Sequence, residues 1–125
     1  MPLSSFNMEK PYDFAKRSIL FGRQCRIFIN KIPRSIGVED DERQLIRSSG
    51  SIGANYVEAQ EGLSKKDSTK YLKISRKEAK ECTHWLAIFT VHITNSFLEE
   101  ERETLCCEAQ ELVRILTSMI KKLEK

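Results

Sequence analysis

The chain has few residues that interrupt helices, with 5 glycines and 3 prolines among 125 residues. This scarcity favours an all-α fold, and no segment has the pattern of a β-strand. No apolar run approaches the roughly 18 residues that a membrane-spanning helix needs. Residues 1–10 also lack the basic and then apolar pattern of a signal peptide. We therefore expect a cytoplasmic protein without a membrane partner.

The chain is also poor in metal-binding residues, with only two histidines, His84 and His92. Glu81 and His84 have the Glu-x-x-His spacing of di-iron bundles, but such a site needs this motif on two helices and a carboxylate from each of two others. The last expected helix contains no histidine, so one chain cannot complete the site. The adjacent Cys106 and Cys107 lack the spacing of a zinc site. We predict no metal and no cofactor.

Signatures of nucleophilic catalysis are absent as well, since no local motif places a base beside a serine or cysteine nucleophile. Cys25 and Cys82 fall on apolar helical faces, as reduced structural thiols do. The sequence therefore predicts a protein that is not an enzyme.

What the chain does contain is typical of a soluble globular protein, with 40% hydrophobic and 31% charged residues. A length of 125 residues is enough for one core without disulfides, and we expect a single domain over residues 1–125. The net charge of +3 is too small to indicate nucleic-acid binding by itself. The positions of the charges therefore matter more than their sum.

Apolar residues recur at helical spacing in four segments, which predicts helices at about 13–32, 41–62, 65–93 and 97–122. The expected core stripes are Phe14, Ser18, Phe21, Cys25, Phe28 and Ile32; Leu45, Ser49, Ile52, Tyr56, Ala59 and Leu63; Leu72, Ser75, Ala79, Cys82, Leu86, Phe89 and Ile93; and Leu105, Ala109, Leu112, Leu116, Met119 and Leu123. Short turns between amphipathic helices favour an antiparallel up-and-down four-helix bundle.

Capping residues mark the ends of these segments. Asp13 is the expected N-cap of the first helix, and Pro33 stops that helix. Ser64 followed by Asp67 resembles a capping box before the third helix, and Ser96 followed by Glu99 repeats this pattern before the fourth.

Polar residues interrupt the apolar pattern on the second and third expected helices. They share helical spacing on each segment and comprise Arg47, Ser51, Asn55, Glu58, Glu78 and Glu81. Two interpretations remain open: a largely buried structural network in which Arg47 or Asn55 pairs with the two later carboxylates, or a ligand site.

Five lysines lie on one face of the third expected helix, and we call them the lysine rail: Lys66, Lys70, Lys73, Lys77 and Lys80. Such a row could neutralise the phosphates of RNA or DNA without reading their sequence. It could equally be a solvated helix face. A third interpretation is a subunit contact, because Glu99, Glu100, Glu101 and Glu103 place opposite charge at the start of the fourth helix.

The polar pattern coincides with a known family. Arg47, Ser51, Ile52, Asn55 and Glu58 are followed downstream by Lys77, Glu78, Ala79, Glu81, Trp85 and Leu86. This arrangement closely resembles the bacterial four-helix bundle proteins first known from reading frames within intervening sequences of large-subunit ribosomal RNA genes. Ala59 stands where many members have glycine. Tyr12-Asp13-Phe14 and Ile32-Pro33 are also similar to the family, so the resemblance covers most of the chain.

The resemblance implies an antiparallel four-helix bundle that assembles as a homopentamer. A related family, the accessory subunit of diversity-generating retroelements, has a basic surface that binds nucleic acid and a protein partner. The relation implies a similar surface on this protein. The breadth of the third apolar stripe, with Tyr71, Ile74, Trp85 and Ile88 on one side, also favours self-association. The two remaining hypotheses are an oligomer that binds nucleic acid and a bundle that contacts only proteins.

Overall fold

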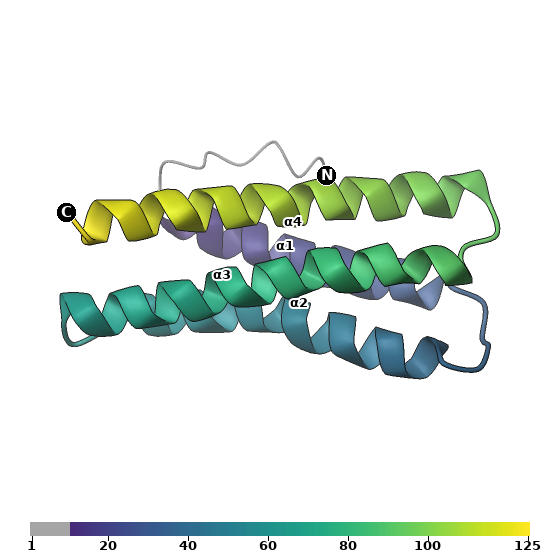
Figure 1. Ribbon diagram of the computed structural model, residues 1–125, viewed down its shortest axis with the longest axis horizontal. Helices are drawn as coiled ribbons and strands as arrows, with labels where there is room; N and C mark the ends of the chain where they lie inside the picture. The colour runs from purple at the N-terminus through teal and green to yellow at the C-terminus, as the bar shows by residue number, and fades with distance from the viewer. Residues whose placement is uncertain (1–10) are drawn as a thin grey trace.

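The computed structural model describes the backbone of residues 11–125 and the side chains from Asp13 onward. The prediction of no signal peptide in residues 1–10 lies outside this part. The elements are α1 (Pro11–Asn30), α2 (Val38–Gln60), α3 (Lys65–Ile88), the short 3-10 helix η2 (Phe89–His92) and α4 (Ser96–Leu123). The four long helices lie side by side, and short connections at alternate ends of the bundle reverse the chain each time (Figure 1). The predicted all-α four-helix fold is confirmed, and residues 11–125 contain no strand.

The start of α3 shows why the local sequence sets its position. The Ser64 side chain accepts a hydrogen bond of 3.0 Å from the Asp67 backbone N–H. The Asp67 carboxylate in turn accepts one of 3.4 Å from the backbone N–H of Leu63. These bonds satisfy amide groups that the first helical turn leaves without intrahelical partners. The predicted cap at Ser64 is confirmed.

The caps predicted for α1 and α4 are wrong. The first helix begins at Pro11, so Asp13 lies inside its first turn. Proline suits this position because its fixed φ matches a helix and its missing N–H would have no intrahelical partner. For α4 the N-cap is Asn95, whose side chain accepts a hydrogen bond of 2.9 Å from the Leu98 backbone N–H. Asparagine is at least as good a cap as the serine that follows it.

Three predicted helices are too long at their C-terminal ends, the first because α1 ends at Asn30. Regular α-helix ends at Ile88, and the chain then tightens into η2, where the Ile93 N–H donates to the Thr90 carbonyl over 3.3 Å. The β-branched side chains of Thr90 and Val91 lower the helix propensity there. Likewise α2 ends at Gln60, so Leu63 falls beyond the helix and is exposed.

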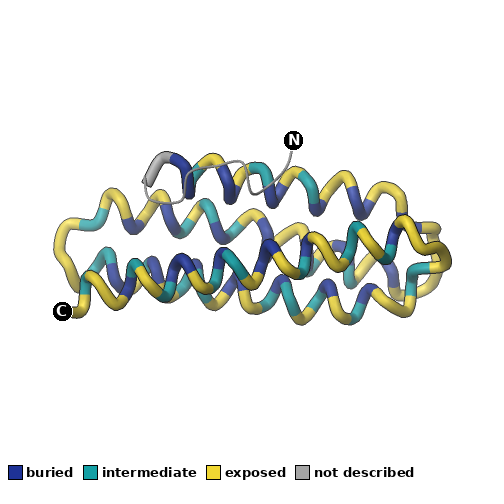
Figure 2. Tube along the Cα trace, turned by 90° about the horizontal axis from the view of Figure 1, so that it is seen from above, coloured by how far each residue is buried: buried dark blue, intermediate teal, exposed yellow. Residues whose placement is uncertain are grey.

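The core lies along the axis of the bundle. Figure 2 shows buried segments recurring along each helix between exposed ones. The positions that the stripes predict and that are buried include Phe14, Phe21, Cys25, Phe28, Ile32, Leu45, Ile52, Tyr56, Leu72, Ala79, Cys82, Leu86, Phe89, Leu105, Ala109, Leu112 and Leu116. The helical period alone therefore identified most of the core.

Small residues let α2 approach both of its neighbours closely. A Cβ atom at Gly53 would lie 2.7 Å from the Ser18 hydroxyl oxygen on α1. On the other side, the buried Ser75 hydroxyl of α3 donates a hydrogen bond of 2.7 Å to the Ile52 carbonyl oxygen. The helix-propensity cost of about 1 kcal/mol for a glycine is thus offset at Gly53 by close packing.

Candidate functional site

The five lysines of the rail are all exposed on α3. They recur after four, three, four and three residues, so at about 100° per residue they share one side of the helix. The buried residues Leu72, Ala79 and Leu86 occupy the other side. The α-helical rise of about 1.5 Å per residue gives the rail a length of about 21 Å from Lys66 to Lys80.

Most of these ammonium groups have no anionic partner in the part of the chain that the structure describes. Lys73 forms an ion pair of 2.9 Å with Glu124 near the end of α4. The Lys70 ammonium lies 4.6 Å from the centre of the Tyr71 ring. Within the side chains that the structure describes, Lys66, Lys77 and Lys80 form no ion pair.

Two shallow surface hollows lie along the rail. One, of about 520 Å³, is lined by Lys73, Arg76, Lys77, Lys80, Glu81 and His84. The other, of about 720 Å³, is lined by Lys65, Lys66, Thr69, Lys70, Lys73, Leu123 and Glu124. His84 is exposed and extends the rail by one turn, which its spacing of seven residues from Lys77 could have revealed.

The glutamates that could have opposed the rail lie elsewhere. They occupy the first turns of α4, beside the C-terminal end of α3, where Arg102 donates a hydrogen bond of 3.3 Å to the Leu86 carbonyl oxygen. Glu99 is paired with Arg102, and Glu101 is paired with Lys31, the residue that follows α1. The Arg102 guanidinium lowers the pKa of the Glu99 carboxyl. Within one chain, these acids therefore leave the rail uncovered.

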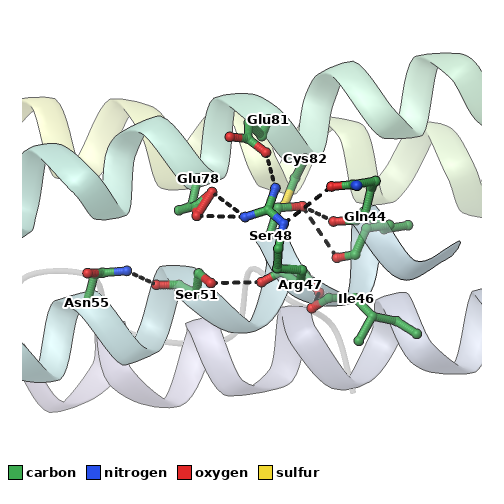
Figure 3. A network of polar contacts seen from close by, with 11 residues as sticks. Gln44, Ile46, Arg47, Ser48, Ser51, Asn55, Glu78, Glu81 and Cys82 are labelled. Atoms are coloured by element: carbon green, nitrogen blue, oxygen red, sulfur yellow. Dashed lines mark hydrogen bonds and ion pairs between the residues drawn. The ribbon is translucent and has the colours of Figure 1, made fainter. Parts of the chain in front are cut away.

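Arg47 of α2 joins the two helices that carry the predicted polar network (Figure 3). Its guanidinium donates to both Glu78 carboxylate oxygens, at 3.2 and 3.1 Å, and to Glu81. These bonds, the one to Glu81 first, raise the pKa of the Arg47 side chain. The Arg47 side chain is 47% exposed and that of Glu78 only 10%. The network is thus a pairing at the edge of the core, and the prediction that it is largely buried is wrong.

The remaining predicted members do not reach the carboxylates. The Ser51 hydroxyl donates to the Arg47 carbonyl and the Asn55 amide to the Ser51 carbonyl, each over 2.8 Å along the same helix. Glu58 is exposed, and its inclusion was wrong. Its neighbour Ala59 accepts a hydrogen bond from Ser68. Because α2 and α3 are antiparallel, Glu58 stands about level with Thr69, which is nine positions before Glu78 and so about 13.5 Å away along the helix.

A buried ion pair was missed from the sequence. Arg17 of α1 and Glu108 of α4 are joined by two hydrogen bonds, of 2.5 and 2.6 Å, and their side chains are 7% and 5% exposed. The bond to Glu108 raises the pKa of Arg17. Arg17 comes three positions after the core residue Phe14, and Glu108 comes three positions after the core residue Leu105. This helical spacing is the feature of the sequence that could have indicated their burial.

Two further findings concern the described residues. Their histidine, cysteine and acidic side chains form no cluster of three or more that could hold a metal ion. None of their helices has both the length and the apolar character needed to span a bilayer.

The fold and this surface define an all-α four-helix bundle with a cationic helix face. The chain belongs to the 23S rRNA-intervening sequence protein family, since a sequence model of that family matches residues 12–118. The resemblance to this family that the residues from Arg47 to Leu86 indicate is thereby confirmed. Among solved structures, the chain is similar to a Bacteroides thetaiotaomicron protein of unknown function from the S23 ribosomal protein family. The two share 28% identity over 89% of this chain and 97% of the other, with a TM-score of 0.72. No curated protein matches the chain.

Proposed function

We propose that the protein is a self-associating, non-enzymatic bundle of the cytoplasm that binds the phosphates of RNA or DNA through the lysine rail. The observation that carries this proposal is the exposure of all five lysines, four of them without an ion pair to a described side chain. Each strand of duplex DNA places a charge about every 3.4 Å along the axis, so a rail of about 21 Å spans several phosphates. A homopentamer, which the family resemblance implies, would present several rails and gain avidity.

The rail fits backbone contact better than base recognition. The aromatic residues near it, Tyr71 and Trp85, are half-buried, so they offer no open platform on which bases could stack. We therefore expect binding that depends strongly on salt and weakly on sequence. The family name refers to 23S rRNA, which makes a structured RNA a useful test ligand.

The test is fluorescence anisotropy with labelled single-stranded RNA, duplex RNA and duplex DNA at two salt concentrations. The test variant carries Lys70→Gln, Lys73→Gln and Lys77→Gln. The control variant carries Lys31→Gln, Arg43→Gln and Arg114→Gln, which remove the same charge from exposed positions just after α1, on α2 and on α4. Each lost phosphate contact should flatten the slope of log K against log salt by about 0.9 for a duplex.

We expect the rail variant to lose up to about three such contacts while the control retains its slope. Binding that is absent at low salt, or equal in both variants, would leave a protein partner as the surviving function. In that case the exposed rail would be a solvated face.

A further inference from the structure

A second surface, remote from the rail, lies between α1 and α2. It is a groove of about 340 Å³ whose lining includes Ile19, Gly22, Gly50, Gly53, Ala54 and Val57. Large apolar side chains stand exposed along it, Ile19 at 60% and Val57 at 50%. Exposed apolar side chains gathered at one groove, with cations at its rim, are typical of a surface that another helix covers.

The two glycines of α2 differ in what the chain itself requires of them. Gly53 is needed for the approach of α1, as described above. A Cβ atom at Gly50 would meet only the tip of the flexible Arg26 side chain, at 3.3 Å, and Gly50 is exposed. Nothing in the packing of one chain therefore accounts for a glycine at position 50. Close approach of a further helix would account for it.

The rim of the groove carries two cations that have no carboxylate partner among the described side chains. Arg23 is exposed and forms no ion pair with residues 13–125. Among the residues that the structure describes, Arg26 donates only to the carbonyls of Gly22 and Ile46 and to the Ser49 hydroxyl. The two arginines are three residues apart, which is about 4.5 Å along α1.

The start of α4 presents the complementary charges at the same spacing. Glu100 and Glu103 are exposed, are also three residues apart, and form no ion pair within the described part of the chain. Phe97, one turn earlier, is 82% exposed, and Cys107, one turn later, is exposed as well. Two acidic residues thus lie between Phe97 and Cys107 along a single exposed helical segment.

We propose that the α1/α2 groove receives the Phe97–Cys107 segment of α4 from a second copy of this chain. With the partner's helix antiparallel to α1, pairing Arg26 with Glu100 also brings Arg23 level with Glu103 and Ile19 level with Cys107. Gly50 stands about level with Phe21, since Gly22 packs beside Ser49, and so faces the part of the segment between Glu103 and Cys107. The two contacting surfaces differ, so the contact is heterologous and can close into a ring. It involves α1, α2 and α4 and leaves the rail on α3 uncovered.

This assignment rests on the proposed self-association and names its interface. Light scattering tests the self-association and the interface separately. We expect Val57→Glu to reduce the native mass to that of a monomer. The matched control Val91→Glu, which changes an exposed valine outside the groove, should retain the mass of the parent protein. We expect Gly50→Ala to raise the melting temperature of the dissociated chain, because alanine favours helix, and yet to weaken assembly.

Disulfide trapping tests the register. Under mild oxidation with copper phenanthroline, Ile19→Cys should give a ladder of covalent oligomers through the native Cys107. The ladder should vanish when Cys107→Ser is added, and Val91→Cys should give none.

A monomeric parent protein would overturn both the self-association and the groove assignment. An oligomeric parent whose mass is unchanged by Val57→Glu would overturn the groove assignment alone. A ladder that persists with Cys107→Ser would overturn the proposed register, and one that persists when Cys106→Ser is added as well would overturn the α4 segment as the occupant.

Discussion

The thiol of Cys82 lies 3.4 Å from the hydroxyl oxygen of Ser48, inside the interface between α2 and α3. Both residues are completely buried. Burial raises the pKa of the Cys82 thiol to about 12, and it also raises the pKa of Cys25 well above its ordinary value. Because the thiolate is the reactive form, these two cysteines should be inert in the folded protein, whereas Cys107 is exposed.

The buried thiols predict a loss of stability at alkaline pH. Above about pH 9 the Cys82 thiol ionises in the unfolded chain, but the folded chain keeps its proton up to about pH 12. The unfolded state then binds fewer protons, so the free energy of unfolding falls as pH rises, by up to about 1.4 kcal/mol per pH unit per thiol.

Urea denaturation at pH 8 and pH 10 measures this effect. The Cys82→Ala variant should be less stable at pH 8 because it leaves a cavity, and it should lose less stability between the two pH values. Equal losses in the variant and the parent would contradict the assignment. Ellman's reagent should meanwhile modify Cys107 first and the buried pair only after unfolding.

Removing one partner of the Arg17–Glu108 pair should destabilise the fold strongly. In Arg17→Ala the Glu108 carboxylate remains buried without its cation, and we expect a loss of about 3 kcal/mol in the free energy of unfolding. Replacing both residues, as in Arg17→Met with Glu108→Leu, should recover much of that loss. Urea titrations of the single and double variants measure both effects, and a double variant less stable than Arg17→Ala would contradict the account.

Arg47→Ala should cost less than Arg17→Ala. Arg47 is half exposed, so water can reach the carboxylates that it leaves, and we expect about 1–2 kcal/mol. Glu58→Ala should change stability by no more than about 0.5 kcal/mol, as at an ordinary surface position. The urea midpoints of the three variants give the ranking. An Arg47→Ala effect as small as that of Glu58→Ala would favour a ligand role for Arg47.

Core positions could be predicted from the sequence because they follow the helical period. Contacts between helices could not, because they depend on the axial offset between one packed helix and its neighbour. Phe21, Leu86 and Leu112 were identified because burial follows the period of the chain itself. The partnership of Arg17 with Glu108, 91 residues away, depends on how α1 stands against α4. The same reason explains Glu58, which has the correct spacing on α2 but stands level with the wrong part of α3.

The start of a helix could be predicted to the residue only where a single residue was clearly the best N-cap. Ser64 has a capping partner three residues later and no competing cap beside it. At the start of α4, by contrast, Asn95 and Ser96 are adjacent and both are good caps, so the pattern left an uncertainty of one residue.

The placement of acidic residues at the start of α4 also gives the whole molecule an electrical polarity. The first turn of α2 adds Glu39, Asp40 and Asp41 at that same end of the bundle. At the opposite end lie the first lysines of α3 and, on α4, Lys121 and Lys122. The bundle therefore has a dipole moment along its long axis, beyond the effect of its net charge. An approaching polyanion would turn the molecule lysine end first before contact, and added salt would weaken this orienting torque beyond about 10 Å.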